Sequence, residues 1–162
     1  MIQSISRLLL SVTLLADLVA VDKSYSQTVA NWGPWVCGAQ ISIGLNTNLV
    51  KAGSTKTLYT WVHNGSTNAF RFDPNQSRPY VITNASGKTY MVTPIINYDL
   101  NIPNITVEPG QLREWSWTVT FGKDIGIGEY VFMPITRDIT AAGGKVCTLT
   151  SNSIKVKVVK DN

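Results

Sequence analysis

The chain has 162 residues, 44% of them hydrophobic, and a formal net charge of +4, which accommodates one domain or one domain with a leader. Its basic residues are scattered along the chain and do not form the concentrated basic stripe that nucleic-acid binding requires. We therefore expect no nucleic-acid partner.

The first 26 residues have the features of a signal peptide. Arg7 provides a short basic region, residues 8–21 are mostly apolar with Asp17 as their only charge, and Ser24 and Ser26 are small residues suited to cleavage before position 27. The apolar run is shorter than a membrane span, and it contains a carboxylate. The sequence predicts a leader at 1–26, a domain at 27–162, no membrane span after leader removal, and a secreted or periplasmic (extracytoplasmic) location. Retention of the leader as an anchor is the alternative.

The sequence contains two cysteines, Cys37 and Cys147, which lie near the two ends of the expected domain. An exported protein enters an oxidising compartment, where two cysteines usually pair. We therefore expect a Cys37–Cys147 disulfide with a structural role. If residues 1–26 did not direct export, two buried free thiols would be the default.

Alternation of apolar and polar residues, with turn signals about every 8–12 residues, is typical of a β-sandwich or barrel. In residues 40–45, Ile41, Ile43 and Leu45 share one face. Similar patterns predict further strands at 55–63, 69–72, 79–83, 88–93 and 105–107.

Residues 112–121 form the clearest expected strand, with the core-facing side chains Trp115, Trp117, Val119 and Phe121. Tyr130 follows a glycine turn and precedes a strand at 131–136, which resembles the tyrosine corner of sandwich domains. A last strand is expected at 153–159. The sequence predicts an all-β, immunoglobulin-like antiparallel sandwich of about seven to nine strands.

Several motifs occur in an order known from one family. They are Asn64-Gly65-Ser66-Thr67-Asn68, Phe70-Arg71-Phe72, Arg78-Pro79-Tyr80-Val81-Ile82, Ser86-Gly87-Lys88, Glu108-Pro109-Gly110-Gln111 and Gly128-Glu129-Tyr130. The order resembles the intracellular proteinase inhibitor family of Bacillus, the BsuPI domain, over residues 55–135. The resemblance implies an immunoglobulin-like fold and proteinase inhibition. The chain departs from the family pattern at residues 74–77 and at Val81, where the family has Ser-Gly-Gln and aspartate.

Residues for catalysis or metal binding are few. His63 is the only histidine, which excludes blue-copper sites, and no C-x-x-C spacing for structural zinc is present. No nucleophile elbow of the Gly-x-Ser-x-Gly type occurs. No two carboxylates fall at close spacing on one expected strand face, as a glycosidase pair would require. We expect neither an enzyme nor a cofactor.

Four asparagines begin N-x-S/T triplets and are expected in surface loops: Asn64, Asn75, Asn84 and Asn104.

Two sets of side chains are candidates for binding a partner. Trp32 and Trp35 precede the first strand beside glycine and proline, where an exposed pair could bind a glycan or a protein chain. Residues 94–104 lack strand alternation, and prolines stiffen both ends of this apolar loop. Its candidate contact residues are Ile95, Ile96, Tyr98 and Leu100.

These observations favour a secreted, non-catalytic module that binds a protein partner, with proteinase inhibition as the most specific version. The alternative is a structural or accessory domain of an envelope or extracellular assembly without a separate activity.

Overall fold

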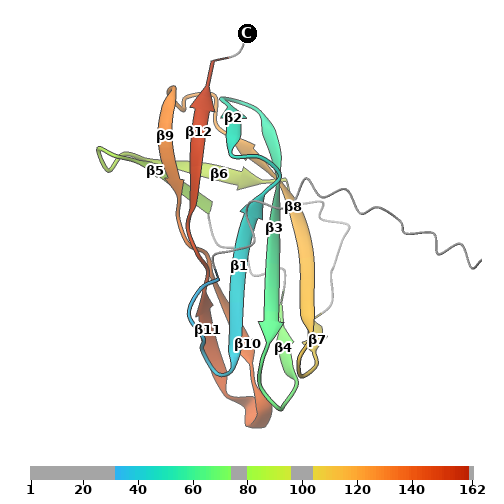
Figure 1. The fold of residues 1–162 in the computed structure, drawn as a ribbon. Helices are drawn as coiled ribbons and strands as arrows, with labels where there is room; N and C mark the ends of the chain where they lie inside the picture. The colour runs from blue at the N-terminus through green and yellow to red at the C-terminus, as the bar shows by residue number, and fades with distance from the viewer. Residues whose placement is uncertain (1–31, 74–79, 96–103, 161–162) are drawn as a thin grey trace, which may run out of the picture.

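A computed structural model describes residues 32–73, 80–95 and 104–160 of the protein. These residues form twelve strands in two sheets (Figure 1). The strands are β1 (Ala39–Leu45), β2 (Leu49–Lys51), β3 (Thr55–Asn64), β4 (Phe70–Phe72), β5 (Tyr80–Asn84), β6 (Thr89–Pro94), β7 (Ile105–Val107), β8 (Leu112–Phe121), β9 (Gly128–Phe132), β10 (Thr136–Thr140), β11 (Val146–Thr150) and β12 (Ile154–Val159).

The larger sheet has eight strands in the order β1-β3-β8-β6-β5-β9-β12-β2, and the smaller one has four in the order β11-β10-β4-β7. The two edge strands of the larger sheet, β1 and β2, are joined by residues 46–48, so this sheet curls back on itself. Figure 1 shows β2, β5, β6, β9 and β12 in one half of the molecule, and β4, β7, β10 and β11 in the other.

The predicted immunoglobulin-like sandwich is confirmed, and the predicted alternation places side chains as expected. Ile41 and Ile43 of β1 are fully buried, and so are Leu58 and Val62 of β3. One hydrophobic cluster receives buried side chains from both sheets, and Trp115 and Trp117 of β8 pack against it while remaining partly exposed. The ring of Trp115 lies 4.5 Å from that of Phe72 on the smaller sheet, measured between centroids.

Three features differ from the sequence prediction. Twelve strands are present in the described residues, more than the seven to nine expected, because β2, β10 and β11 were not predicted. The expected strand 131–136 is wrong: β9 ends at Phe132, and β10 begins at Thr136 in the other sheet. Pro134, which has no N–H for a sheet ladder, lies at this crossing. Finally, β2 pairs with β12 in parallel, so the sandwich is not wholly antiparallel.

Two predicted links that hold the sandwich together are confirmed. The hydroxyl of Tyr130 donates to the carbonyl oxygen of Gly126 at 2.8 Å, as in a tyrosine corner. Cys37 and Cys147 form a disulfide with a Cα–Cα distance of 6.4 Å across a sequence separation of 110 residues. Because Cys37 precedes β1 and Cys147 lies on β11, the disulfide joins the two sheets.

In the described ranges, no helix is long and apolar enough to cross a membrane. The expected leader at 1–26 lies outside the described residues.

Candidate functional site

Trp35 is a large apolar side chain that is held in place yet exposed. Its indole is 53% exposed although it lies against the turn that follows β3. A Cβ atom at Gly65 would come within 2.7 Å of the six-membered ring, so the ring can rest on this turn only because residue 65 is glycine. The turn itself is fixed, because the Gly65 N–H donates to the carbonyl oxygen of Gly38 at 2.8 Å.

His63 lies beside this indole and links it to two further side chains. The His63 ring lies 5.5 Å from that of Trp35 and 6.2 Å from that of Trp32, measured between centroids. Leu112 is paired with His63 across β3 and β8 and is 56% exposed. We call Trp32, Trp35, His63 and Leu112 the end patch, since they gather where β3 ends and β8 begins.

A buried asparagine, Asn64, fixes the turn that follows β3, beside the end patch. Asn64 is fully buried, and its Nδ2 donates to the carbonyl oxygens of Asn68 and Val107, both at 2.9 Å. Its Oδ1 accepts from the backbone N–H of Ser66 at 2.9 Å and from the Ser66 hydroxyl at 2.7 Å. The side chain therefore fastens the β3–β4 turn to β7. Because Asn64 is buried, the expectation that this N-x-S/T asparagine lies at the surface is wrong.

Two further aromatic side chains, Tyr59 and Trp61, lie along the outer face of β3, away from the end patch. The rings of Tyr59 and Trp61 stack with centroids 5.7 Å apart and planes 18° from parallel. The Nε1 of Trp61 donates to a carboxylate oxygen of Glu114 on β8. Trp61 lies outside the main hydrophobic cluster but is only 6% exposed, so it offers little contact surface.

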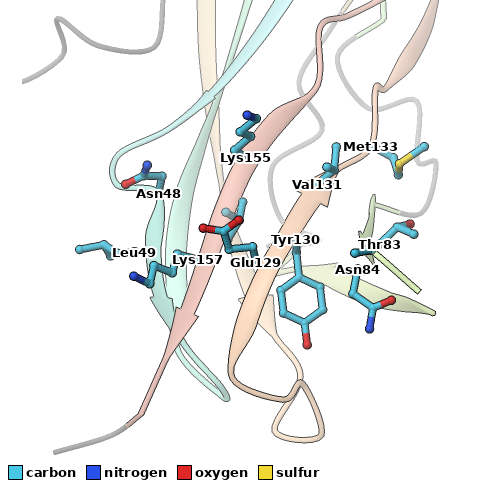
Figure 2. A pocket seen from close by; sticks show the side chains of 12 residues that line it. Asn48, Leu49, Thr83, Asn84, Glu129, Tyr130, Val131, Met133, Lys155 and Lys157 are labelled. Atoms are coloured by element: carbon cyan, nitrogen blue, oxygen red, sulfur yellow. The ribbon is translucent and has the colours of Figure 1, made fainter. Parts of the chain in front are cut away.

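A second surface lies in the other half of the molecule. A hollow of about 610 Å³ is formed on the outer face of β5, β9, β12 and β2. Figure 2 shows Lys157 of β12 beside Glu129 of β9, Lys155 further along β12, and Leu49 and Met133 on opposite sides, with Val131 on β9 between them. These apolar side chains are Leu49, Val131 and Met133, which are 52%, 38% and 42% exposed. The hollow thus combines apolar contact area with two exposed amines.

Three titratable side chains of the described residues have pKa values raised above their ordinary ones. Burial raises the pKa of the Tyr80 phenol above its ordinary value of 10.0, an effect that the nearby Arg137 guanidinium opposes. The Nη2 of Arg137 donates to the Tyr80 hydroxyl at 3.0 Å. A bond to the Tyr90 side chain raises the pKa of Lys88, and burial raises that of Tyr130.

In the part of the chain that the structure describes, no group of three or more His, Cys, Asp or Glu side chains is arranged to hold a metal ion.

The structure brings some of the predicted binding residues together. Trp32 and Trp35 both contact the His63 ring, which the sequence assigned no special role. Ile95 is 52% exposed just after β6, where its N–H donates to the carbonyl oxygen of Thr118 at 2.7 Å. Ile96, Tyr98 and Leu100 lie outside the described residues. Leu112 was missed, although strand alternation places it on the polar face with Glu114 and Ser116, which was a signal of its exposure.

No protein-family model matches the sequence, and no curated protein sequence matches it. Among solved structures, an ApaA protein from Bordetella pertussis is similar, with 10% identity, a TM-score of 0.48, and coverage of 74% of this chain and 93% of that one. The C-terminal domain of Wzt has 16% identity and a TM-score of 0.46, covering 82% and 78%. A cohesin module from a Clostridium perfringens family 33 glycoside hydrolase has 15% identity and a TM-score of 0.40, covering 81% and 99%.

At these identities and TM-scores, the likenesses carry no conclusion about activity or partners. The similarity to the BsuPI family stays a prediction.

Proposed function

We propose that this protein is a secreted, non-catalytic immunoglobulin-like module that binds a protein partner through the end patch. The observation that carries the proposal is the 53% exposure of Trp35, whose ring rests against Gly65. Tryptophan is among the residues most enriched at the energetic centres of protein interfaces. A ring that is already fixed loses little conformational freedom when a partner covers it.

The composition of the end patch favours a protein partner. Leu112, 56% exposed, adds aliphatic surface beside the His63 imidazole, which itself contacts both indoles. Aromatic and aliphatic side chains around one anchor resemble the apolar centre of a protein interface. The expected export of the chain accords with the Cys37–Cys147 disulfide, since such bonds persist in oxidising compartments.

Partner capture tests the proposal directly. The domain is immobilised and exposed to the extracytoplasmic fraction of its source cells, in parallel with Trp35→Ala and with Met91→Ala. Met91 is a matched control because it is apolar and 65% exposed but lies on β6. We expect one protein to be retained by wild type and Met91→Ala and lost with Trp35→Ala. Equal retention by all three baits would contradict binding through the end patch.

Proteinase inhibition is the most specific version of this function. A standard inhibitor presents a rigid exposed loop to the enzyme cleft. The exposed Ile95 begins the segment 94–104 that we predict to be this loop, and its backbone is tied to β8. Assays against subtilisin-type and trypsin-type enzymes test this version, and the absence of inhibition at micromolar concentrations would exclude it for those enzymes.

The second candidate is an accessory domain that joins two components of an envelope or extracellular assembly. It is favoured by the hollow, which lies in the other half of the molecule from the end patch and exposes Leu49, Val131 and Met133. A joining domain would retain two proteins, one lost with Trp35→Ala and the other with Val131→Asp. A module with one partner would lose nothing with Val131→Asp.

A further inference from the structure

Asn64-Gly65 is the only Asn-Gly pair in the sequence. This pair is prone to deamidation, because glycine has no side chain to hinder attack by its own backbone nitrogen. In that reaction the Gly65 nitrogen loses its proton and bonds to Cγ of Asn64, while the Cγ–Nδ2 bond breaks and ammonia leaves. Water then opens the cyclic imide to aspartate or isoaspartate.

The folded protein blocks both reacting groups. Asn64 is fully buried, and both atoms of its amide are hydrogen-bonded, Nδ2 to two carbonyl oxygens and Oδ1 to the Ser66 backbone and hydroxyl. Cγ is therefore held in one orientation and is closed to water. Ammonia can leave only if both Nδ2 bonds break.

The nucleophile is also occupied. The Gly65 N–H donates to the carbonyl oxygen of Gly38 at 2.8 Å, and the Trp35 ring lies against one side of Gly65, which is otherwise exposed. The backbone of Asn64 is also held by two hydrogen bonds. Its N–H donates to the carbonyl oxygen of Gln111 at 3.0 Å, and its carbonyl oxygen accepts from the N–H of Gly110 at 2.7 Å. Rotation of the Asn64–Gly65 peptide toward Cγ would break several of these bonds at once.

We propose that Asn64 is a deamidation site that is protected in the folded protein and reactive only after unfolding. Each unfolding event then carries a chance of permanent chemical change at this position. The modification accumulates in molecules that have spent time unfolded, so the modified fraction reflects how long the protein has been unfolded.

The product cannot restore the native contacts. In an aspartate at position 64, an oxygen replaces Nδ2 and faces the carbonyl oxygens of Asn68 and Val107, so two acceptors meet an anion without a donor. Isoaspartate additionally lengthens the backbone in the turn on which Trp35 rests. The change therefore disables the end patch together with the β3–β4 turn.

The test compares folded protein with protein unfolded in urea, both disulfide-bonded, at the same mildly alkaline pH. Tryptic peptide mapping follows the peptide 57–71. Fragmentation of this peptide by mass spectrometry shows whether Asn64 or Asn68 has lost its amide. We expect loss of the Asn64 amide to be slower in the folded sample by at least about a thousandfold, since a marginally stable domain is unfolded at most about one part in a thousand of the time. Equal rates in the two samples would overturn the proposal.

Two variants test the bonds of Asn64 and the effect of the aspartate product. Ser66→Ala removes the hydroxyl that donates to Oδ1 and keeps the backbone bond. We expect faster deamidation in the folded state than wild type shows, and an unchanged rate would contradict protection by this network. Asn64→Asp should unfold at lower urea than wild type and recover part of the difference at acidic pH, where the protonated carboxyl can donate. An unchanged urea midpoint for Asn64→Asp at neutral pH would contradict the claim that aspartate cannot restore the native contacts of Asn64.

Discussion

At the scale of single residues, the hydroxyl of Tyr130 closes the turn before β9 by donating to Gly126 at 2.8 Å. Tyr130→Phe removes this bond and keeps the ring, so we expect the free energy of unfolding to fall by about 1 kcal/mol. Urea denaturation measures the change. Tyr90→Phe is the comparison variant, because the Tyr90 ring contacts Tyr130 but its hydroxyl bonds the exposed Lys88 side chain, and such surface bonds contribute little. A larger loss from Tyr90→Phe would contradict the tyrosine-corner role.

The sequence predicted Tyr130 because a glycine turn before a late strand is a local pattern. It did not predict the placement of His63 between Trp32 and Trp35, because the three side chains come from separate segments and meet only in the folded chain. The burial of Asn64 was also hidden, since Asn-Gly ordinarily indicates an exposed turn.

At the scale of elements, one side chain covers the free edge of β1 at Ile43, while the Gly33 N–H donates to the Ile41 carbonyl oxygen further along this edge. The Oδ1 of Asn152 accepts from the backbone N–H of Ile43 at 2.9 Å, and its Nδ2 donates to the carbonyl oxygen of Ile43 at 3.2 Å. Asn152 thus replaces a neighbouring strand at this position. An uncovered edge is a template for pairing with another chain.

We expect Asn152→Ala to lower the free energy of unfolding by about 1–3 kcal/mol, because it leaves the Ile43 backbone groups without these partners. It should also promote self-association, measured by sedimentation. Asn152→Asp keeps the acceptor for the Ile43 N–H, so its free energy of unfolding should lie between those of wild type and Asn152→Ala. A monomeric Asn152→Ala with wild-type stability would contradict this role.

Elements with period-two alternation were predictable, as β8 and β12 illustrate. The strand β10 was not predicted, because the charged pair Arg137-Asp138 interrupts the apolar pattern, and Arg137 is nevertheless buried with its guanidinium bonded to Tyr80. Which sheet a strand joins depends on the crossing at Pro134, and local sequence does not report it.

At the scale of the whole molecule, the disulfide joins the two sheets and closes a loop of 110 residues. Replacing both cysteines by serine should lower the free energy of unfolding by about 4–5 kcal/mol, mainly because the unfolded chain gains freedom. Thermal and urea unfolding of oxidised wild type and the double variant measure the difference. A loss below about 1 kcal/mol would contradict a structural role for the bond.

Alkaline pH should destabilise the whole fold. The pKa of Tyr80 is raised by burial above 10.0, so the folded state holds this proton more tightly than the unfolded chain does. The stabilisation is complete below about pH 10 and is lost as pH rises through the folded-state pKa. Tyr80→Phe should be less stable at neutral pH, because Arg137 loses an acceptor, but should show a shallower decline above pH 10. Identical alkaline slopes would contradict this assignment.

The central claim, that the module binds a protein through the end patch, is tested most directly by the affinity of Trp35→Ala for the captured partner. If Trp35 is the anchor, the variant should bind about thirtyfold more weakly than wild type, equivalent to about 2 kcal/mol, while Met91→Ala binds as wild type does. Calorimetric titration of the three proteins provides the comparison. Equal affinities for Trp35→Ala and wild type would contradict the account.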